Sequence, residues 1–190
     1  MSDETLEPVT DPLPPRRGLL LIVLTLVVLS ADVITKAVVV ATLEGERPVK
    51  LLGGFAYLQL VRNPGAAFSM ATGMTWVLTL IAIGVVIAIV WIMPKLRSVG
   101  WAIGLSLVLA GALGNLSDRI FRAPGPLRGH VIDFVSVFEP NGDAWPVFNV
   151  ADSSIVVGGA VIVLMALLGR EYDGRSTRRV SSSASEAEPS

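Results

Sequence analysis

The stretch LLLIVLTLVVLSADVITKAVVVA, residues 19–41, decides the fold, because nearly all of its residues are apolar. An α-helix of about 20 apolar residues crosses the ~30 Å hydrocarbon core of a bilayer. Three further stretches of this kind follow, at residues 74–93, 99–116 and 150–168. Four such helices leave too little polar surface for a water-soluble fold in a short chain. We therefore predict an all-α membrane protein with four transmembrane helices.

Composition agrees with this fold class and excludes several functions. Of 190 residues, 52% are hydrophobic and 16% are charged, whereas about a quarter are charged in an average soluble domain. A net charge of -1 gives no field that would attract nucleic acid. The absence of cysteine and the single histidine, His130, exclude a thiol nucleophile and a multi-histidine metal centre. No nucleotide-binding glycine motif is present, so we expect neither a metal nor a cofactor.

The spans fix the organisation of the chain. Residues 18–170 form one four-helix domain, and the Pro-, Ser- and Glu-rich tails at 1–17 and 171–190 are predicted to be disordered. An even number of spans places both termini on one side. That side carries more Lys and Arg than the other, which predicts cytoplasmic termini. The first span is longer than the apolar part of a signal peptide, and Lys36 interrupts its end, so we expect a retained helix.

The connections between spans are unequal in length. The outward segments are residues 42–73 and 117–149, whereas only residues 94–98 join the second and third spans, which must form an antiparallel hairpin. The run FAYLQLV at 55–61 predicts short strands with turns. Several prolines in 117–149 predict a segment that is mostly loop. Small residues in the third span predict close helix packing, namely Gly100, Gly104, Ala110 and Gly114.

Polar residues lie near the outer ends of the spans. A polar side chain near the hydrocarbon costs free energy, so each one needs a structural or functional explanation. Asp32 and Lys36 lie on one face of the first helix. They form either an ion pair that fixes helix packing or a support for a site. Asn115, Asp118 and Arg119 share one face of the third helix. The simpler interpretation is an interfacial helix end with a solvated charge pair, but Asn115, next to Gly114 in the last apolar turn, is harder to explain in this way.

Two aspartates carry the chemical hypothesis. Asp133 lies between Ile132 and Phe134, and Asp152 lies at the start of the fourth span. Asp152 alone could be a helix cap, as could Asn149, but a cap does not explain a second aspartate at the same depth. Two carboxylates in a poorly solvated place share a proton. One can then activate water while the other protonates a carbonyl, as in an aspartic peptidase.

Five segments, in this order, resemble the lipoprotein signal peptidases, or signal peptidase II. They are DVITK (32–36), NPGAAFS (63–69), GALGNLSDR (111–119), VIDF (131–134) and FNVADS (148–153). The resemblance implies a catalytic pair, Asp133 and Asp152. It implies supporting or substrate-binding roles for Asn63, Asn115, Arg119, Asn149, Asp32 and Lys36. It also implies a small extracytoplasmic β-cradle and a helical flap, both from residues 42–73.

The resemblance further implies the substrate and the compartment. The substrate would be a prolipoprotein whose cysteine carries a diacylglyceryl group, cut just before that cysteine. The enzyme would lie in the bacterial cytoplasmic (inner) membrane, with its site toward the outer face. We expect a monomer in contact with membrane lipids, with no cofactor and no nucleic acid. Residues 122–129 are longer and richer in proline than the family pattern, which leaves substrate preference open.

Two other functions remain as alternatives. A serine–lysine peptidase would use Lys36 with Ser69 or Ser30, but Asp32 would keep this lysine charged, whereas the dyad needs it neutral. An ion-coupled transporter would also hold carboxylates within the membrane. Transporters often have internal repeats and midplane sites, whereas this chain shows no repeat and its polar residues lie at the outer rim.

Overall fold

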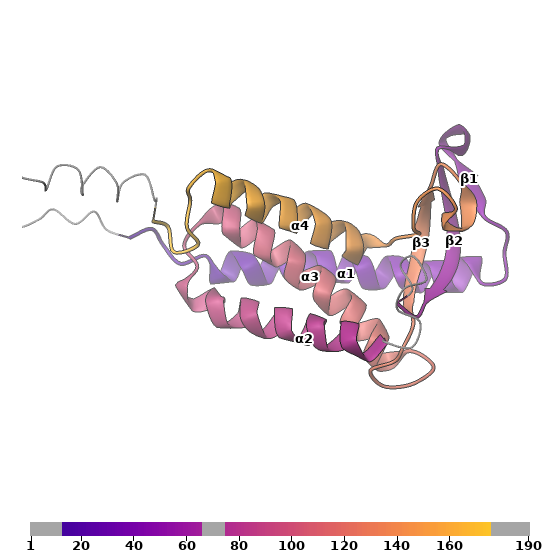
Figure 1. The fold of residues 1–190 in the computed structure, drawn as a ribbon, viewed down its shortest axis with the longest axis horizontal. Coiled ribbons are helices and arrows are strands. Elements are labelled where there is room, and N and C mark those ends of the chain that lie inside the picture. Colours follow the sequence, from indigo (N-terminus) through magenta and orange to yellow (C-terminus); the bar gives the residue numbers. More distant parts are fainter. Residues whose placement is uncertain (1–12, 66–74, 176–190) are drawn as a thin grey trace, which may run out of the picture.

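Four long helices form one bundle in a computed structural model of the chain, which describes residues 13–65 and 75–175 (Figure 1). They are α1 (Gly18–Leu43), α2 (Thr75–Ile92), α3 (Val99–Phe121) and α4 (Val150–Leu167). Each helix is long and apolar enough to cross a membrane. The four predicted spans are confirmed, although the first residue of the second one, Met74, lies outside the described residues.

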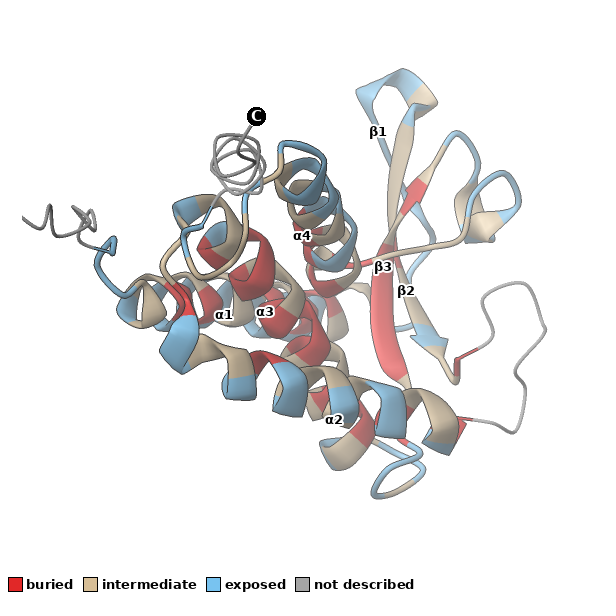
Figure 2. Cartoon of the chain, turned by 60° about the vertical axis from the view of Figure 1, so that its left-hand side comes forward, coloured by how far each residue is buried: buried red, intermediate tan, exposed pale blue. Residues whose placement is uncertain are grey.

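Helix α3 forms the centre of the bundle, because it contacts α1, α2 and α4. Figure 2 shows buried residues concentrated on α3 and β3. Glycines allow the close approach that the sequence predicts. A Cβ atom on Gly104 would lie 3.1 Å from the carbonyl oxygen of Gly158 in α4. A Cβ atom on Gly114 would lie 2.4 Å from Asp32 Oδ2 in α1.

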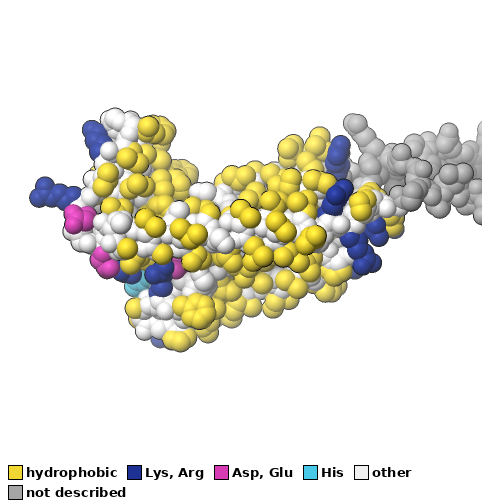
Figure 3. Space-filling view, turned by 180° about the vertical axis from the view of Figure 1, so that it is seen from behind, with side chains coloured by type: hydrophobic (Ala, Val, Ile, Leu, Met, Phe, Trp, Pro, Cys, Tyr) yellow, Lys and Arg dark blue, Asp and Glu magenta, His cyan; other side chains and the backbone are white. Residues whose placement is uncertain are grey.

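The outer faces of the helices are apolar and exposed, for example at Val27, Ile87 and Val156. Figure 3 shows hydrophobic side chains over the flank of the bundle, with charged side chains toward both ends. Exposed apolar side chains of this extent suit a hydrocarbon surrounding. The chain is therefore a membrane protein by its surface as well as by its helix lengths.

Helix α3 is longer than the span predicted from apolar residues. It continues from residue 116 to Phe121. Leu116, Asp118 and Arg119 are all buried in this last part, so the polar residues of the helix end turn into the protein and do not face solvent. The end of an apolar run therefore shows where the hydrocarbon ends, whereas the helix itself can continue further.

A three-stranded antiparallel sheet lies at one end of the bundle (Figure 1). Its order is β1 (Val49–Leu51), β2 (Ala56–Asn63) and β3 (Val131–Val137). Strand β2 confirms the strand predicted around 55–61. Strand β3 shows that the prediction of a mostly loop segment at 117–149 was wrong for residues 131–137. The prolines of that segment flank a run rich in valine and isoleucine, which favours a strand.

The predicted helical flap stays a prediction. Among the described residues of 42–73, the only helical element beyond the end of α1 is a 3-10 turn, Leu52–Gly54. Residues 66–74 lie outside the described part of the chain. The sheet itself, which is the predicted β-cradle, is present and takes its third strand from a later segment than expected.

The opposite end of the bundle holds parts of both tails. The backbone N–H of Arg17 donates to Leu96 O at 2.8 Å, and that of Arg97 donates to Tyr172 O at 2.9 Å. Residues 13–17 and 171–175, which were assigned to disordered tails, are thus held against the α2–α3 connection. Residues 1–12 and 176–190 lie outside the described residues.

Candidate active site

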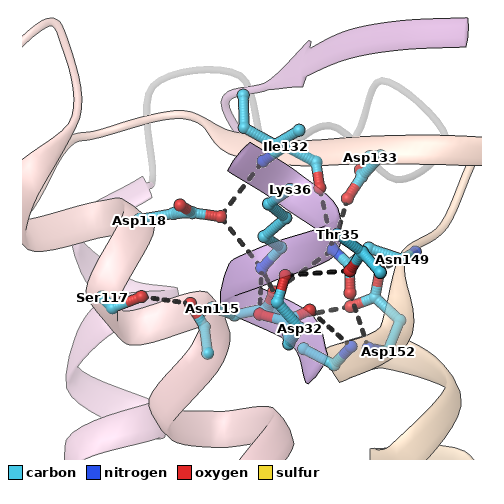
Figure 4. Close-up of polar contacts among 12 residues, drawn as sticks. Asp32, Thr35, Lys36, Asn115, Ser117, Asp118, Ile132, Asp133, Asn149 and Asp152 are labelled. Carbon is cyan, nitrogen blue, oxygen red and sulfur yellow. Dashed lines mark hydrogen bonds and ion pairs between the residues drawn. The ribbon is translucent and has the colours of Figure 1, made fainter. Parts of the chain in front are cut away.

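Strand β3 brings Asp133 to the start of α4. Asp133 pairs with Val61 of β2 in the sheet register. Further along β3, Val135 and Phe148 exchange two backbone hydrogen bonds, both of 2.9 Å. The residues just before α4 therefore run beside β3, and Asn149 follows at once as the N-cap of α4. Asp133, Asn149 and Asp152 consequently lie together (Figure 4).

Asn149 connects the two aspartates. Its side-chain amide donates to Asp133 Oδ1 at 2.7 Å, while its Oδ1 accepts the backbone N–H of Asp152 at 2.9 Å. Asp152 Oδ2 in turn accepts the backbone N–H of Asn149 at 3.2 Å, which completes a capping box. Asn149 is 1% exposed. The cap expected at Asn149 or Asp152 thus involves both residues, and it also fixes the link to Asp133.

Two further amides hold the carboxylates from the other side. Asn63 Nδ2 donates to Asp133 Oδ2 at 2.8 Å, and Asn115 Nδ2 donates to Asp152 Oδ1 at 2.8 Å. Each carboxylate therefore receives at least two N–H donors. Donors of this kind stabilise an ionised carboxylate in a buried place. The four residues come from β2, α3, β3 and α4, so the site needs the whole fold.

Lys36 determines how the Asn115 amide is turned. The ammonium group, 1% exposed, lies 2.8 Å from Asp32 Oδ2, 2.9 Å from Asp118 Oδ2 and 3.2 Å from Asn115 Oδ1. An ammonium group only donates hydrogen bonds, so the carbonyl oxygen of Asn115 must face it. The amide NH₂ group is then left to face Asp152. Through Lys36, the Asp32–Lys36 pair packs α1 against α3, whereas its role in supporting the site stays a prediction.

The two aspartates differ in their surroundings. Asp133 is 2% exposed, and burial raises its pKa to about 7, with a smaller contribution from the charge of Asp152. The hydrogen bonds from Asn63 and Asn149 and the charge of Lys36 oppose this rise in pKa. Asp152 is only partly buried. The raised pKa means that Asp133 keeps its proton to a higher pH than an ordinary aspartate does.

Substrate-sized space lies beside the pair. A cleft of about 980 Å³ runs between the end of β2, residues 141–148 and the first turns of α4. Asp133 and Asp152 line it, together with the exposed side chains of Trp145 and Val156. Water and a peptide can therefore reach both carboxylates. Among the residues that the structure describes, no three His, Asp or Glu side chains form a metal-binding group.

Arg119 lies at the same site with spare hydrogen-bonding capacity. The side chain is 8% exposed, and its Nη1 has no hydrogen-bond partner among the described residues. A Cβ atom on Gly65 would lie 3.8 Å from this Nη1, which places the guanidinium at the end of β2. A buried donor without a partner costs stability, so this arrangement suits a guanidinium that donates a hydrogen bond to an acceptor on a ligand.

Comparison with known proteins decides the family. A family model described as signal peptidase (SPase) II matches residues 24–168. The chain belongs to the signal peptidase II family. Two lipoprotein signal peptidases are similar to it. That of Rhodococcus jostii (strain RHA1) is 60% identical over 164 residues, which is 86% of this chain and 80% of the relative. That of Mycolicibacterium smegmatis (strain ATCC 700084 / mc(2)155) is 51% identical over 201 residues, with 100% and 82% covered.

A solved structure has a similar fold. A bacterial membrane enzyme determined at 1.9 Å resolution is 28% identical, with a TM-score of 0.69 over 83% of this chain and 98% of that one. The region that matches the signal peptidase II family contains every site residue predicted from the sequence. The structure brings Asn63, Asn115, Asn149 and the two aspartates into direct contact, with Asp32 and Lys36 behind them and Arg119 at the edge.

The sequence did not reveal that Asp118 is buried beside the site. The sequence suggested a solvated pair with Arg119, but Asp118 is buried and binds Lys36, Arg122 and the backbone N–H of Ile132. Its position three residues after Asn115 puts it on the same helical face as the site. That spacing was the available signal.

Proposed function

We propose that this member of the signal peptidase II family removes signal peptides from prolipoproteins with Asp133 and Asp152 as an aspartyl pair. The observation that carries the proposal is the side chain of Asn149, which donates to Asp133 and caps the helix that bears Asp152. This amide holds two carboxylates together in a place where both cannot ionise cheaply. Such a pair at neutral pH has one proton to give and one site to receive a proton.

The chemistry follows from the different surroundings of the two residues. The ionised Asp152, which faces the cleft, takes a proton from water while the water oxygen attacks the scissile carbonyl carbon. Asp133 gives its proton to the carbonyl oxygen, so that a tetrahedral diol forms. Asp152 then returns its proton to the leaving nitrogen and Asp133 recovers the proton of the diol as the C–N bond breaks. Both carboxyl groups end as they began.

The cleft supports a substrate that is part peptide and part lipid. Its polar floor carries the two aspartates, whereas Val156 and Val157 on α4 are exposed apolar side chains at its wall. A diacylglyceryl chain on the cysteine would lie in hydrocarbon along α4 while the peptide bond before the cysteine reaches the aspartates. The Nη1–H of Arg119 would donate a hydrogen bond to one carbonyl oxygen of the substrate. Anchoring both molecules in one membrane lowers the entropic cost of their encounter.

Charge distribution and the location of the site support the orientation. The excess of Lys and Arg on the side of the termini favours cytoplasmic termini in the bacterial inner membrane. The sheet, whose strand β3 carries Asp133, lies at the end of the bundle away from the termini (Figure 1), which supports a site at the outer face. We further propose that the protein acts as a monomer surrounded by lipid.

A serine–lysine mechanism has less support. The Lys36 amine is bound by two carboxylates and Asn115, so these contacts occupy the group that a serine–lysine mechanism needs as its base. Ser30 is exposed and is not among the partners of Lys36, and Ser69 lies outside the described residues.

The test is a gel-shift cleavage assay in detergent on a diacylglyceryl-modified prolipoprotein. The wild type is compared with Asp133→Asn and Asp152→Asn, each checked for intact folding by thermal unfolding. We expect cleavage by the wild type and none by either variant. Near-normal cleavage by a folded variant would refute the aspartyl pair. An unmodified prolipoprotein serves as the matched substrate, and its equal cleavage would refute the requirement for lipid.

A further inference from the structure

Each proposed catalytic aspartate follows a residue whose backbone N–H is bound by a buried carboxylate. The N–H of Ile132, just before Asp133, donates to Asp118 Oδ2 at 3.3 Å. The N–H of Ala151, just before Asp152, donates to Asp32 Oδ1 at 2.9 Å. The first contact reaches from α3 to β3, and the second reaches from α1 to α4. Two separate segments of the site are thus fixed in the same way.

One ammonium group joins the two carboxylates. Lys36 Nζ lies 2.8 Å from Asp32 and 2.9 Å from Asp118, as Figure 4 shows. The exposed fractions of Asp32, Lys36 and Asp118 are 0%, 1% and 4%, so water does not weaken these contacts. The other oxygen of Asp118 binds Arg122, which balances the second negative charge. The path from Ile132 to Ala151 is therefore continuous through three side chains.

We propose that Asp32, Lys36 and Asp118, the Lys36 triad, set the position of Asp133 relative to Asp152. Each carboxylate holds the backbone beside one aspartate, and Lys36 fixes the separation of the two carboxylates. These are positioning residues, because they do not border the cleft or touch the reacting atoms. The proposal rests on the proposed function only where it treats the two aspartates as catalytic.

Stability alone does not account for this arrangement. Burying charges costs about as much free energy as their pairing returns, so a buried ion pair is weak support for a purely stabilising role. Apolar side chains would pack α1 against α3 at no such cost. In contrast, a misplacement of reacting groups by about 1 Å can lower a rate by about 100-fold. A charged triad with directional bonds is suited to limit such movement.

The test reads the two backbone amides directly. Amide hydrogen exchange is measured residue by residue by NMR in detergent micelles, with the Arg97 amide at the other end of the bundle as an internal reference. We expect Asp118→Ala to speed exchange at Ile132 by about tenfold or more, and Asp32→Ala to do so at Ala151. Lys36→Met is expected to speed both together. Asp173→Asn, in the exposed Asp173–Arg175 pair, is the matched control and should change neither.

A second variant guards against a failure to fold. Lys36→Met leaves two buried carboxylates without their shared cation, which can be strongly destabilising. The variant with Asp32→Asn, Lys36→Met and Asp118→Asn is uncharged in the triad and keeps oxygen acceptors for Ile132 and Ala151. We expect it to fold, to exchange both amides faster than the wild type, and to lose tenfold or more in kcat with KM within about twofold.

The measurements distinguish a failure of the triad proposal from a failure of the aspartyl pair. Unchanged exchange at Ile132 and Ala151 in the Lys36 variants would overturn the proposal. A uniform rise that includes Arg97 would overturn it too, because it would indicate only a loss of global stability. If exchange responds as expected but Asp133→Asn and Asp152→Asn still cleave substrate, the aspartyl pair is wrong while the triad still positions these segments.

Discussion

Asn149 Nδ2 lies 2.7 Å from Asp133 Oδ1, and the same side chain caps the helix on which Asp152 sits. One amide thus has two functions, a bond to one carboxylate and a cap for the helix of the other. A substitution that keeps one function and removes the other can therefore separate activity from stability.

The substitution Asn149→Ser keeps the helix cap and removes the bond to Asp133. Serine is a good N-cap, so the unfolding free energy should stay within about 1 kcal/mol of the wild type, but its hydroxyl is too short to reach Asp133. We expect a loss of about 10- to 100-fold in kcat in the prolipoprotein cleavage assay. Asn149→Ala, which removes the cap as well, should additionally lower thermal stability by about 0.5–2 kcal/mol. Wild-type kcat in Asn149→Ser would contradict the role of the bond to Asp133.

The pH profile of cleavage should fall on the alkaline side near neutrality. Burial and the neighbouring Asp152 raise the pKa of Asp133 to about 7, so its proton is lost as the pH rises through that value. Because the proton is needed for the scissile carbonyl, kcat/KM should decline above about pH 7. The check is kcat/KM across buffers of constant ionic strength. A rate that stays constant well into the alkaline range would show that Asp133 is not the acid.

Asn63→Ala should move this alkaline limb. The amide of Asn63 donates to Asp133 Oδ2 at 2.8 Å and lowers the pKa of that carboxyl. Its removal should therefore raise the pKa of Asp133 further and shift the limb to higher pH. The same kcat/KM series measures the shift, with Asp173→Asn as a distant control. A shift in the acidic direction would mean that Asn63 acts on another group.

Stability should depend on the same group. The pKa of Asp133 in the folded protein lies above its ordinary value of 3.8, so the folded protein binds this proton more tightly than the unfolded chain does. Its contribution to the unfolding free energy is most favourable below pH 3.8 and is lost as the pH rises through about 7. Thermal unfolding in detergent should show a smaller decline over this range for Asp133→Asn than for the wild type. Parallel curves would contradict the raised pKa.

Gly114→Ala should damage both folding and activity. The added Cβ would lie 2.4 Å from Asp32 Oδ2, so the Asp32 carboxylate must shift, which disturbs its contact with Lys36. We expect a lower melting temperature and a loss of tenfold or more in kcat. Gly159→Ala is the matched control, since nothing lies within 4 Å of its added Cβ. Equal effects of the two substitutions would show that the close approach at Gly114 does not matter.

The helices could be predicted from the sequence because hydrocarbon sets their length, whatever the rest of the chain does. The end of α3 could not, because Asp118 and Arg119 continue the helix with polar side chains that turn inward. Strand β3 was not predicted because prolines flank it. Its pairing with β2 depends on residues far earlier in the chain, as in the Asn63–Asp133 contact, whose residues are 70 positions apart.

The candidate site was predicted as a set of residues but not as a geometry. The resemblance to the family gave Asn115 and Asn149 supporting roles, yet nothing in the sequence says that both amides meet the same pair of carboxylates. Asp118 was interpreted as a surface charge because its partner Lys36 lies on another helix. Contacts between helices in three dimensions have no local pattern from which they could be inferred.

The contact between Asp32 and the backbone of Ala151 joins residues 119 positions apart, and this separation has a consequence for biosynthesis. In the order of synthesis, Asp133 follows the third span and Asp152 comes only with the first turn of α4. The proposed aspartyl pair is therefore incomplete until the last helix has been made. If the pair is catalytic, a chain that lacks α4 would be unable to cleave its neighbours or itself.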